Sequence, residues 1–139
     1  MTTSIDTNVL VALWFPDDTL NATAAAAMKD AASRGALVIS APVFAELLAA
    51  PRRTEAFLDY FLKDTAIAVD WNLDEQIWRI AGRAFQSYSS RRKSEGIGPR
   101  RILADFLIGA HALQRGYRLL TLDDRLYRTA FPRLSVVPV

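Results

Sequence analysis

A chain of 139 residues that is 51% hydrophobic and 23% charged, with a net charge of only +2, has the composition of one globular domain rather than of a disordered segment. It contains no cysteine, which excludes disulfide bonds and thiolate metal sites and is compatible with a reducing compartment. No basic segment precedes the first apolar residues and no stretch approaches the roughly 18 apolar residues of a membrane span, so we expect a single cytoplasmic domain over residues 1–139 with no membrane contact.

Short apolar segments that are typical of strands recur along the chain. Each is four or five residues long and is followed by a more polar or helix-like stretch. The strand candidates are residues 2–5, 37–40, 66–70, 118–122 and 134–137.

Two helices are predicted in the first half of the chain. Residues 21–34 have high helix propensity, with Asn21 as a capping residue type and Gly35 directly behind. A second helix should start after the second strand candidate, because Pro42 is favoured in a first helical turn, and it should end before Pro51.

The second half of the chain predicts two more helices. The sequence NLDE at residues 72–75 is a variant capping box that opens a long helix, and another helix is expected at roughly residues 100–115. Residues 87–98 are polar and basic and contain glycine, so we expect a loop there. This alternation predicts an α/β fold: a three-layer α/β/α sandwich with a mainly parallel central sheet.

Four acidic residues stand at the ends or flanks of apolar segments. Asp6 and Asp123 directly follow the first and fourth strand candidates, and ligands of open α/β sheets bind beyond the carboxyl ends of the strands. Glu46 lies about a turn and a half into the helix after the second strand. Asp105 lies in the otherwise apolar segment RILADFLIGAHAL, where a charge is least expected.

Each acid also has a purely structural explanation. Asp6 and Asp123 could be cap or turn residues, Glu46 a surface residue, and Asp105 a first-turn acid favoured by the helix dipole. Together in one pocket, however, the four acids would repel one another unless a cation neutralised them. Mg²⁺ or Mn²⁺ prefers such oxygen ligands and suits phosphodiester cleavage, because the ion can activate a water molecule and polarise a phosphoryl oxygen.

The segments that carry these acids resemble the PIN domain in their order and spacing, and in particular the small stand-alone bacterial toxins of the VapC type. They are IDTNVL at residues 5–10, APVFAELLA at 41–49, RILADFLIGAHAL at 101–113 and LLTLDDRLY at 119–127. The resemblance implies a three-layer fold, an acidic pocket with one or two Mg²⁺ or Mn²⁺ ions, and endoribonuclease activity by a metal-activated water. It also implies a cognate antitoxin protein as partner, and a homodimer.

The resemblance carries over to individual residues. Asp6, Glu46 and Asp105 match the three acids most regular in the family and Asp123 matches a more variable fourth, so all four are candidate catalytic residues, with Asp6 and Asp105 as metal ligands. Asn8 and Thr121 match polar positions that orient the acids, and Asp124 is a possible substitute acid.

Arginine dominates the positive charge, since only three of the 17 basic residues are lysine and 14 are therefore arginine. The planar arginine fork suits phosphate. If the chain binds RNA, the basic segment after the long helix is where phosphate would be held, unless it is only a solvated surface loop. The candidate RNA-binding residues are Arg91, Arg92, Lys93, Arg100 and Arg101.

Some aromatic and imidazole side chains have structural interpretations instead. Tyr88, Trp14 and Trp78 could stack on bases, but core packing is preferred for the two tryptophans. His111 lies six residues after Asp105, on a different side of the same helix, and is interpreted as a packed or supporting residue rather than a general base.

Three other functions share part of this sequence pattern. A phosphatase of the haloacid dehalogenase type needs a second aspartate two residues after the first, where this chain has Asn8. A response-regulator receiver could use Asp70 but needs a lysine after its fifth strand, and none is present. A non-catalytic PIN-like module that binds RNA or a partner stays open; such a module should not need all four acids.

Overall fold

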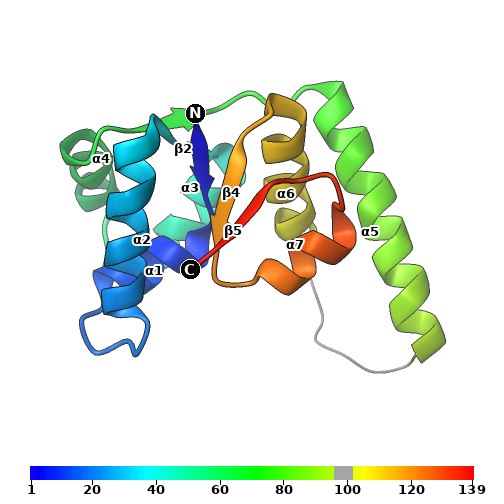
Figure 1. Cartoon of the computed structure of the whole chain (residues 1–139), viewed down its shortest axis with the longest axis horizontal. Helices are drawn as coiled ribbons and strands as arrows, with labels where there is room; N and C mark the ends of the chain where they lie inside the picture. The colour runs from blue at the N-terminus through cyan, green and yellow to red at the C-terminus, as the bar shows by residue number, and fades with distance from the viewer. Residues whose placement is uncertain (96–101) are drawn as a thin grey trace.

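The computed structural model describes residues 1–95 and 102–139, with the side chains of all of these except residues 93–95. Its centre is a sheet in which every neighbouring pair of strands is parallel, in the order β3-β2-β1-β4-β5 (Figure 1). The strands are β1 (Thr3–Ile5), β2 (Leu37–Ser40), β3 (Ile67–Asp70), β4 (Arg118–Thr121) and β5 (Val136–Pro138). The predicted α/β class with a parallel sheet is confirmed.

Helices flank this sheet on both sides: in Figure 1, α2 and α4 lie on the left of β1 and β4, and α5 and α6 on the right. The helices are α1 (Thr7–Trp14), α2 (Asn21–Arg34), α3 (Ala41–Leu48), α4 (Glu55–Asp64), α5 (Glu75–Glu95), α6 (Leu103–Arg115) and α7 (Asp124–Ala130). Among residues 1–95 and 102–139, no helix is both long and apolar enough to cross a membrane.

Strands β1 and β2 are buried along their whole length, and β4 is buried from Leu119 to Thr121, as expected for a parallel sheet covered on both faces. The register aligns their ends: Ile5 of β1 pairs with Leu120 of β4. The residues that follow, Asp6 and Thr121, therefore emerge side by side at one edge of the sheet. This edge is where the sequence places its first and fourth acids.

The prediction of a loop at residues 87–98 is wrong for residues 87–95, because these residues continue helix α5. Residues 96–98 lie outside the described part of the chain. The polar composition misled the prediction, because serine, arginine and lysine are compatible with a helix that packs on only one side. Contacts on that side hold α5 against α6: the Phe106 ring lies 5.0 Å from the Phe85 ring and 5.4 Å from the Tyr88 ring, between centroids.

Two predicted caps differ from the structure. Asn21 does not cap α2; its side-chain amide donates to the carbonyl oxygens of Ala12 and Leu13, each at 3.0 Å, and so satisfies the end of α1. Asp74, rather than Asn72, accepts a hydrogen bond from a backbone N–H of the first turn of α5. The Asn21 side chain thus stands at a helix start but satisfies a neighbouring helix instead.

The tryptophans divide between core and surface. Trp14 is buried against the edges of the Phe57 and Phe61 rings, which confirms its predicted core packing. Trp78 is 47% exposed, so the prediction that it packs in the core is wrong. It lies on the outer side of α5, where helical spacing alone did not distinguish it from the buried Ile77.

Replacing either of two helical glycines with alanine should change the free energy of unfolding, in opposite directions for the two positions. Gly82 of α5 has open space where a Cβ would lie, so Gly82→Ala should raise the free energy of unfolding by about 0.5–1 kcal/mol through helix propensity. A Cβ on Gly109 of α6 would lie 2.3 Å from a ring carbon of the buried Phe131, so Gly109→Ala should lower it by about 1–3 kcal/mol through overpacking. Urea unfolding measures both changes, and a shift of the same sign in the two variants would contradict this account.

Candidate active site

An open pocket of about 450 Å³ lies at the carboxyl ends of β1 and β4. It contains all four acids that the sequence analysis singled out, brought together from β1, α3, α6 and the β4–α7 connection. Its lining residues are Asp6, Thr7, Asn8, Val11, Ala12, Asp18, Glu46, Asp105, Leu122, Asp123 and Tyr127.

Asp6 is the most buried of these acids, with 5% of its surface exposed. Its carboxylate accepts hydrogen bonds from the backbone N–H of Thr7 at 2.8 Å and from the hydroxyl of Thr121 at 2.7 Å. Burial raises the pKa of Asp6 to about 6, against the opposing effect of these hydrogen bonds, and the negative charge of Asp105 adds to the increase. A cation beside Asp6 would remove this penalty on the charged form.

Thr121 and Asn8 connect the end of β1 to the turn that follows β4. The Thr121 hydroxyl donates to Asp6 and accepts from the backbone N–H of Asp123 at 2.9 Å. The Asn8 side chain accepts from the backbone N–H of Leu122 at 3.2 Å. Both contacts suit the orienting role expected for Asn8 and Thr121, which itself stays a prediction.

Glu46 is half-buried on α3, and its carboxylate accepts a hydrogen bond of 2.6 Å from the hydroxyl of Thr7. This bond links α3 to the first turn of α1, directly beside Asp6. Sequence reasoning missed Thr7, because its partner lies 39 positions away and no local pattern records such a contact.

Asp105 occupies the third position of α6 and is half-buried. Its carboxylate accepts from the backbone N–H of Ile102 at 3.3 Å, so it serves the start of the helix while also lining the pocket. Asp123, also half-buried, immediately precedes α7. Asp124 pairs with Arg128 at 3.2 Å and is not among the lining residues.

Tyr127 of α7 is a further pocket residue that the sequence analysis did not identify. Its ring is fully buried, and its hydroxyl lies near the Asp6 carboxylate without forming a hydrogen bond of good geometry. Burial, together with the negative charges of Asp6, Asp105 and Glu46, raises the pKa of Tyr127, so the hydroxyl keeps its proton. A buried O–H donor therefore borders a pocket of carboxylates, where it can bind a water molecule or an anionic oxygen.

The donor atoms of this pocket fit a hard divalent cation. They are carboxylate oxygens whose mutual repulsion a cation would relieve. Within the part of the chain that the structure describes, no three acidic, histidine or cysteine side chains form a complete ligand group. The fit is therefore to an ion held by one or two carboxylates with water in its other positions, as is usual for Mg²⁺.

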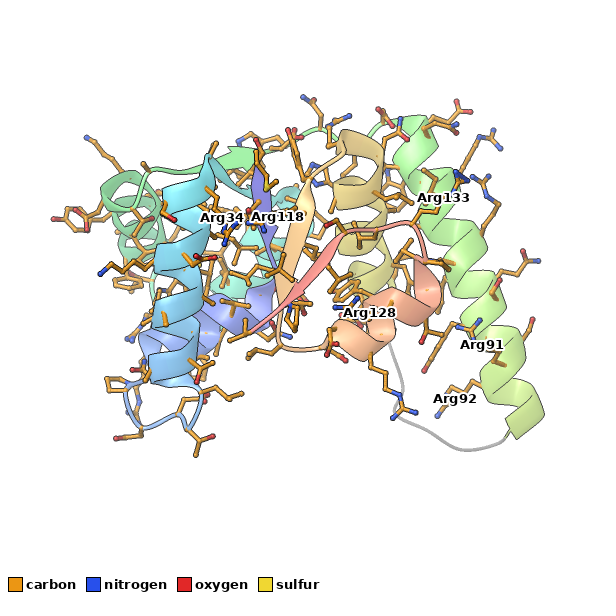
Figure 2. The ribbon with its side chains drawn as sticks, viewed as in Figure 1. Arg34, Arg91, Arg92, Arg118, Arg128 and Arg133 are labelled. Atoms are coloured by element: carbon orange, nitrogen blue, oxygen red, sulfur yellow. The ribbon has the colours of Figure 1, made fainter. Side chains whose placement is uncertain are left out.

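The predicted phosphate-binding residues fall only partly within the structure. Arg91 and Arg92 are exposed in the C-terminal half of α5 (Figure 2). The side chain of Lys93, and Arg100 and Arg101 as a whole, lie outside the described part. The RNA-binding role of all five stays a prediction.

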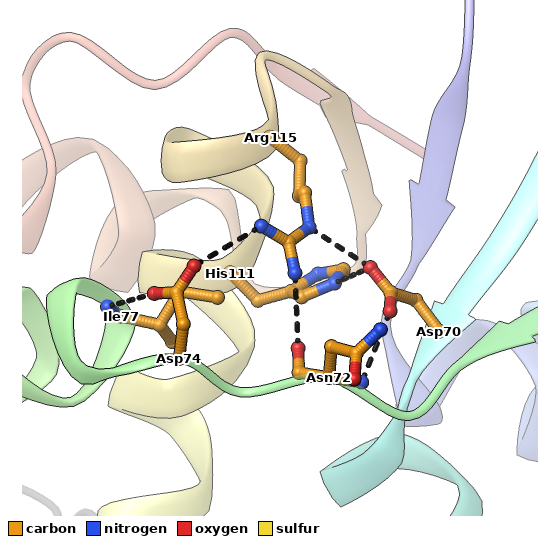
Figure 3. A network of polar contacts seen from close by, with 6 residues as sticks. All are labelled: Asp70, Asn72, Asp74, Ile77, His111 and Arg115. Carbon is orange, nitrogen blue, oxygen red and sulfur yellow. Dashed lines mark hydrogen bonds and ion pairs between the residues drawn. The ribbon is translucent and has the colours of Figure 1, made fainter.

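His111 is fully buried near the opposite end of α6 from Asp105, in agreement with its interpretation as a packed residue. Its Nε2 lies 2.8 Å from a carboxylate oxygen of Asp70, and Arg115 donates to the same oxygen at 3.0 Å (Figure 3). Arg115 also donates to Asp74 at 3.4 Å and to the carbonyl oxygen of Asn72 at 3.3 Å. This network connects the end of β3 and the start of α5 to α6.

The fold and the acidic pocket define an α/β protein with a candidate hydrolytic metal site at the carboxyl edge of its sheet. The chain belongs to the PIN domain family, because the family model of the PIN domain matches residues 4–132. A comparison with curated protein sequences gives no match.

Solved structures of toxin–antitoxin proteins share the fold. The chain is similar to VapBC2 from Rickettsia felis bound to a DNA fragment from their promoter, with 19% identity, a TM-score of 0.69 and coverage of 99% of this chain and 98% of the other. It is also similar to VapBC-1 from nontypeable Haemophilus influenzae, with 20% identity, a TM-score of 0.68 and coverage of 99% of this chain and 98% of the other. The similarity to Mycobacterium tuberculosis VapC20, a sarcin-ricin loop cleaving toxin, has 15% identity, a TM-score of 0.55 and coverage of 86% of this chain and 87% of the other.

Proposed function

We propose that this protein is a Mg²⁺- or Mn²⁺-dependent endoribonuclease that acts as the toxin of a toxin–antitoxin pair. The observation that carries the proposal is the gathering of Asp6, Glu46, Asp105 and Asp123 in one pocket of a PIN domain. Four acids from four separate parts of the chain have no shared structural purpose there, because each would be better solvated apart from the others.

The chain's own residues have distinct parts in this proposal. Asp6 and Asp105 hold the divalent ion, while Thr121 fixes the orientation of the Asp6 carboxylate. A bound ion of this kind lowers the pKa of a water molecule and offsets charge on the phosphoryl oxygens. Glu46, held by Thr7, and Asp123 accept a proton or orient water in this proposal, which their position in the lining of the pocket supports.

A protein partner is part of the same proposal. VapBC and FitAB structures resemble this chain in fold, and VapC20 of Mycobacterium tuberculosis is described as cleaving the sarcin-ricin loop. By extension, a cognate antitoxin would occupy or cover the acidic pocket until RNA cleavage is needed. A homodimer and a cytoplasmic location stay predictions of the same resemblance.

Cleavage of total bacterial RNA tests the nuclease directly. The purified protein should yield discrete fragments with Mg²⁺ or Mn²⁺ and none with EDTA, and Asp105→Asn should slow cleavage by at least about 100-fold because it removes a metal ligand. Asp59→Asn, at an exposed position of α4, is the matched control and should cleave like the natural protein.

Intact RNA under every condition, from protein that is folded and that binds Mn²⁺, would remove the nuclease proposal and favour a non-catalytic PIN-like binding module. A module of that kind should also keep its RNA or partner affinity when Asp105 is replaced by asparagine.

A further inference from the structure

Six of the twelve arginines in the described part of the chain have a polar partner for their side chain. Arg34, Arg79, Arg115 and Arg128 pair with carboxylates, and Arg53 and Arg118 donate to a carbonyl oxygen and to a hydroxyl. The other six have no side-chain hydrogen bond or ion pair with any described residue, and three of these, Arg83, Arg91 and Arg133, line a single groove. Three uncompensated cations around one depression form a site for an anion.

This arginine groove is an open depression of about 300 Å³ between α5, α7 and the segment after α7. Arg83, Ser87 and Arg91 are spaced four residues apart and therefore share one face of α5, and Arg133 lies on the opposite wall. Figure 2 shows Arg91 and Arg133 at different heights along α5. The complete lining is Ile80, Arg83, Ala84, Ser87, Arg91, Leu113, Thr129, Ala130, Phe131, Pro132 and Arg133.

Helix α7 joins the arginine groove to the acidic pocket. Tyr127 lines the acidic pocket, whereas Thr129 and Ala130, less than one turn further on, line the groove. A helix of seven residues is about 10 Å long, so the two sites lie within the reach of a few nucleotides of one strand. A polyanion in the groove can thus extend into the acidic pocket.

We propose that the arginine groove binds the sugar–phosphate backbone of the RNA substrate on one flank of the cut site, an inference that rests on the proposed nuclease function. The arginine forks and the hydroxyls of Ser87 and Thr129 suit phosphate and ribose oxygens, and the apolar floor at Phe131 suits a ribose or a base. The groove is open to solvent and can therefore admit a single strand. The contacts are to the backbone, so the groove supplies affinity and register rather than base preference.

Binding of a fluorescently labelled single-stranded RNA of mixed sequence tests the groove. All proteins carry Asp105→Asn so that the RNA is not cut. The triple variant Arg83→Gln, Arg91→Gln, Arg133→Gln should bind about 10–100-fold more weakly at low salt, and the slope of log affinity against log salt should fall by about 2, since each lost contact with a single strand contributes about 0.7.

The matched control removes the same charge elsewhere: Lys29→Gln and Arg34→Gln on α2 and Lys63→Gln on α4, all at exposed positions. Figure 2 shows Arg34 on the side of the molecule away from α5. The control should keep most of the affinity and most of the salt slope. Both triple variants must show the circular dichroism and melting temperature of their parent.

Equal losses of RNA affinity in the two triple variants, or no loss in either, would overturn the proposal that the arginine groove binds RNA. A change of molecular mass in size-exclusion chromatography without a change in RNA affinity would also overturn it, by showing a protein contact instead. The nuclease is judged separately by metal-dependent cleavage with Asp105 intact. Cleavage together with unchanged binding would refute the groove alone, and groove-dependent binding without any cleavage would refute the nuclease alone.

Discussion

Replacing Asp6 with asparagine is expected to stabilise the metal-free protein at neutral pH and to abolish RNA cleavage. The folded-state pKa of Asp6 is about 6, above the usual value near 4, so the folded protein binds this proton more tightly than the unfolded chain. The contribution of the Asp6 proton to the free energy of unfolding is therefore fully present below about pH 4 and is lost as the pH rises to about 6. Above that pH the buried charge costs on the order of 3 kcal/mol.

Asparagine removes the charge and can still accept the hydrogen bond from the backbone N–H of Thr7. Urea unfolding in EDTA should therefore show Asp6→Asn to be more stable than the natural protein by about 2–3 kcal/mol at pH 7.5 and nearly equal to it at pH 4. Asp59→Asn serves as the control, because Asp59 is exposed on α4. A variant that is less stable at pH 7.5 would show that the hydrogen bonds of Asp6 outweigh its burial.

Metal binding should reverse this order. Mg²⁺ or Mn²⁺ should raise the melting temperature of the natural protein, since it binds only the folded state, and should have little effect on Asp6→Asn. Affinity for the metal should fall as the pH drops through about 6, because Asp6 must release its proton to bind a cation. The group that costs stability in the metal-free protein is thus one that the proposed activity requires.

The four carboxylates could be predicted from the sequence because each interrupts a local pattern. Asp6 and Asp123 follow apolar strands directly, and the carboxyl ends of parallel strands meet at one edge of a sheet. Asp105 stands in a segment too apolar to explain a charge. Glu46 borders the apolar side of its helix, beside Val43 and Leu47, where an acid is unusual, and the resemblance to PIN domains supports its selection.

Other features of the site depend on contacts that no local pattern records. Tyr127 has the spacing of a core aromatic, and only the packing of α7 brings its hydroxyl to the acids. Thr7 and Glu46 are 39 positions apart, and Thr121 and Asp6 are 115 apart. The arginine groove depends on Arg133, far in sequence from Arg83, and on a helix α5 that continues through residues expected to be a loop.

The second large effect is expected at Asp70, which joins β3 to α6 away from the acidic pocket. Partial burial alone would raise the pKa of Asp70, but hydrogen bonds from His111 and Arg115 outweigh it and lower the pKa to about 2. A depressed carboxylate pKa stabilises the folded state fully above about pH 4, and this contribution is lost as the pH falls through about 2. Asp70→Asn should therefore lower the free energy of unfolding at pH 7 by about 1–2 kcal/mol, after allowance for solvent screening.

Urea unfolding at pH 7, 4 and 2.5 measures this dependence, and the difference between Asp70→Asn and the natural protein should shrink only below about pH 4. Asp30→Asn is the matched control, because its ion pair with Arg34 is more than half exposed, with side-chain exposures of 53% and 58%, and should contribute at most a few tenths of a kcal/mol. Equal effects of the two substitutions would contradict a stabilising role for the buried His111 contact. RNA cleavage at pH 7 should be unchanged in Asp70→Asn, since the network lies at the end of α6 opposite Asp105, and a loss of cleavage without a loss of stability would instead connect it to the acidic pocket.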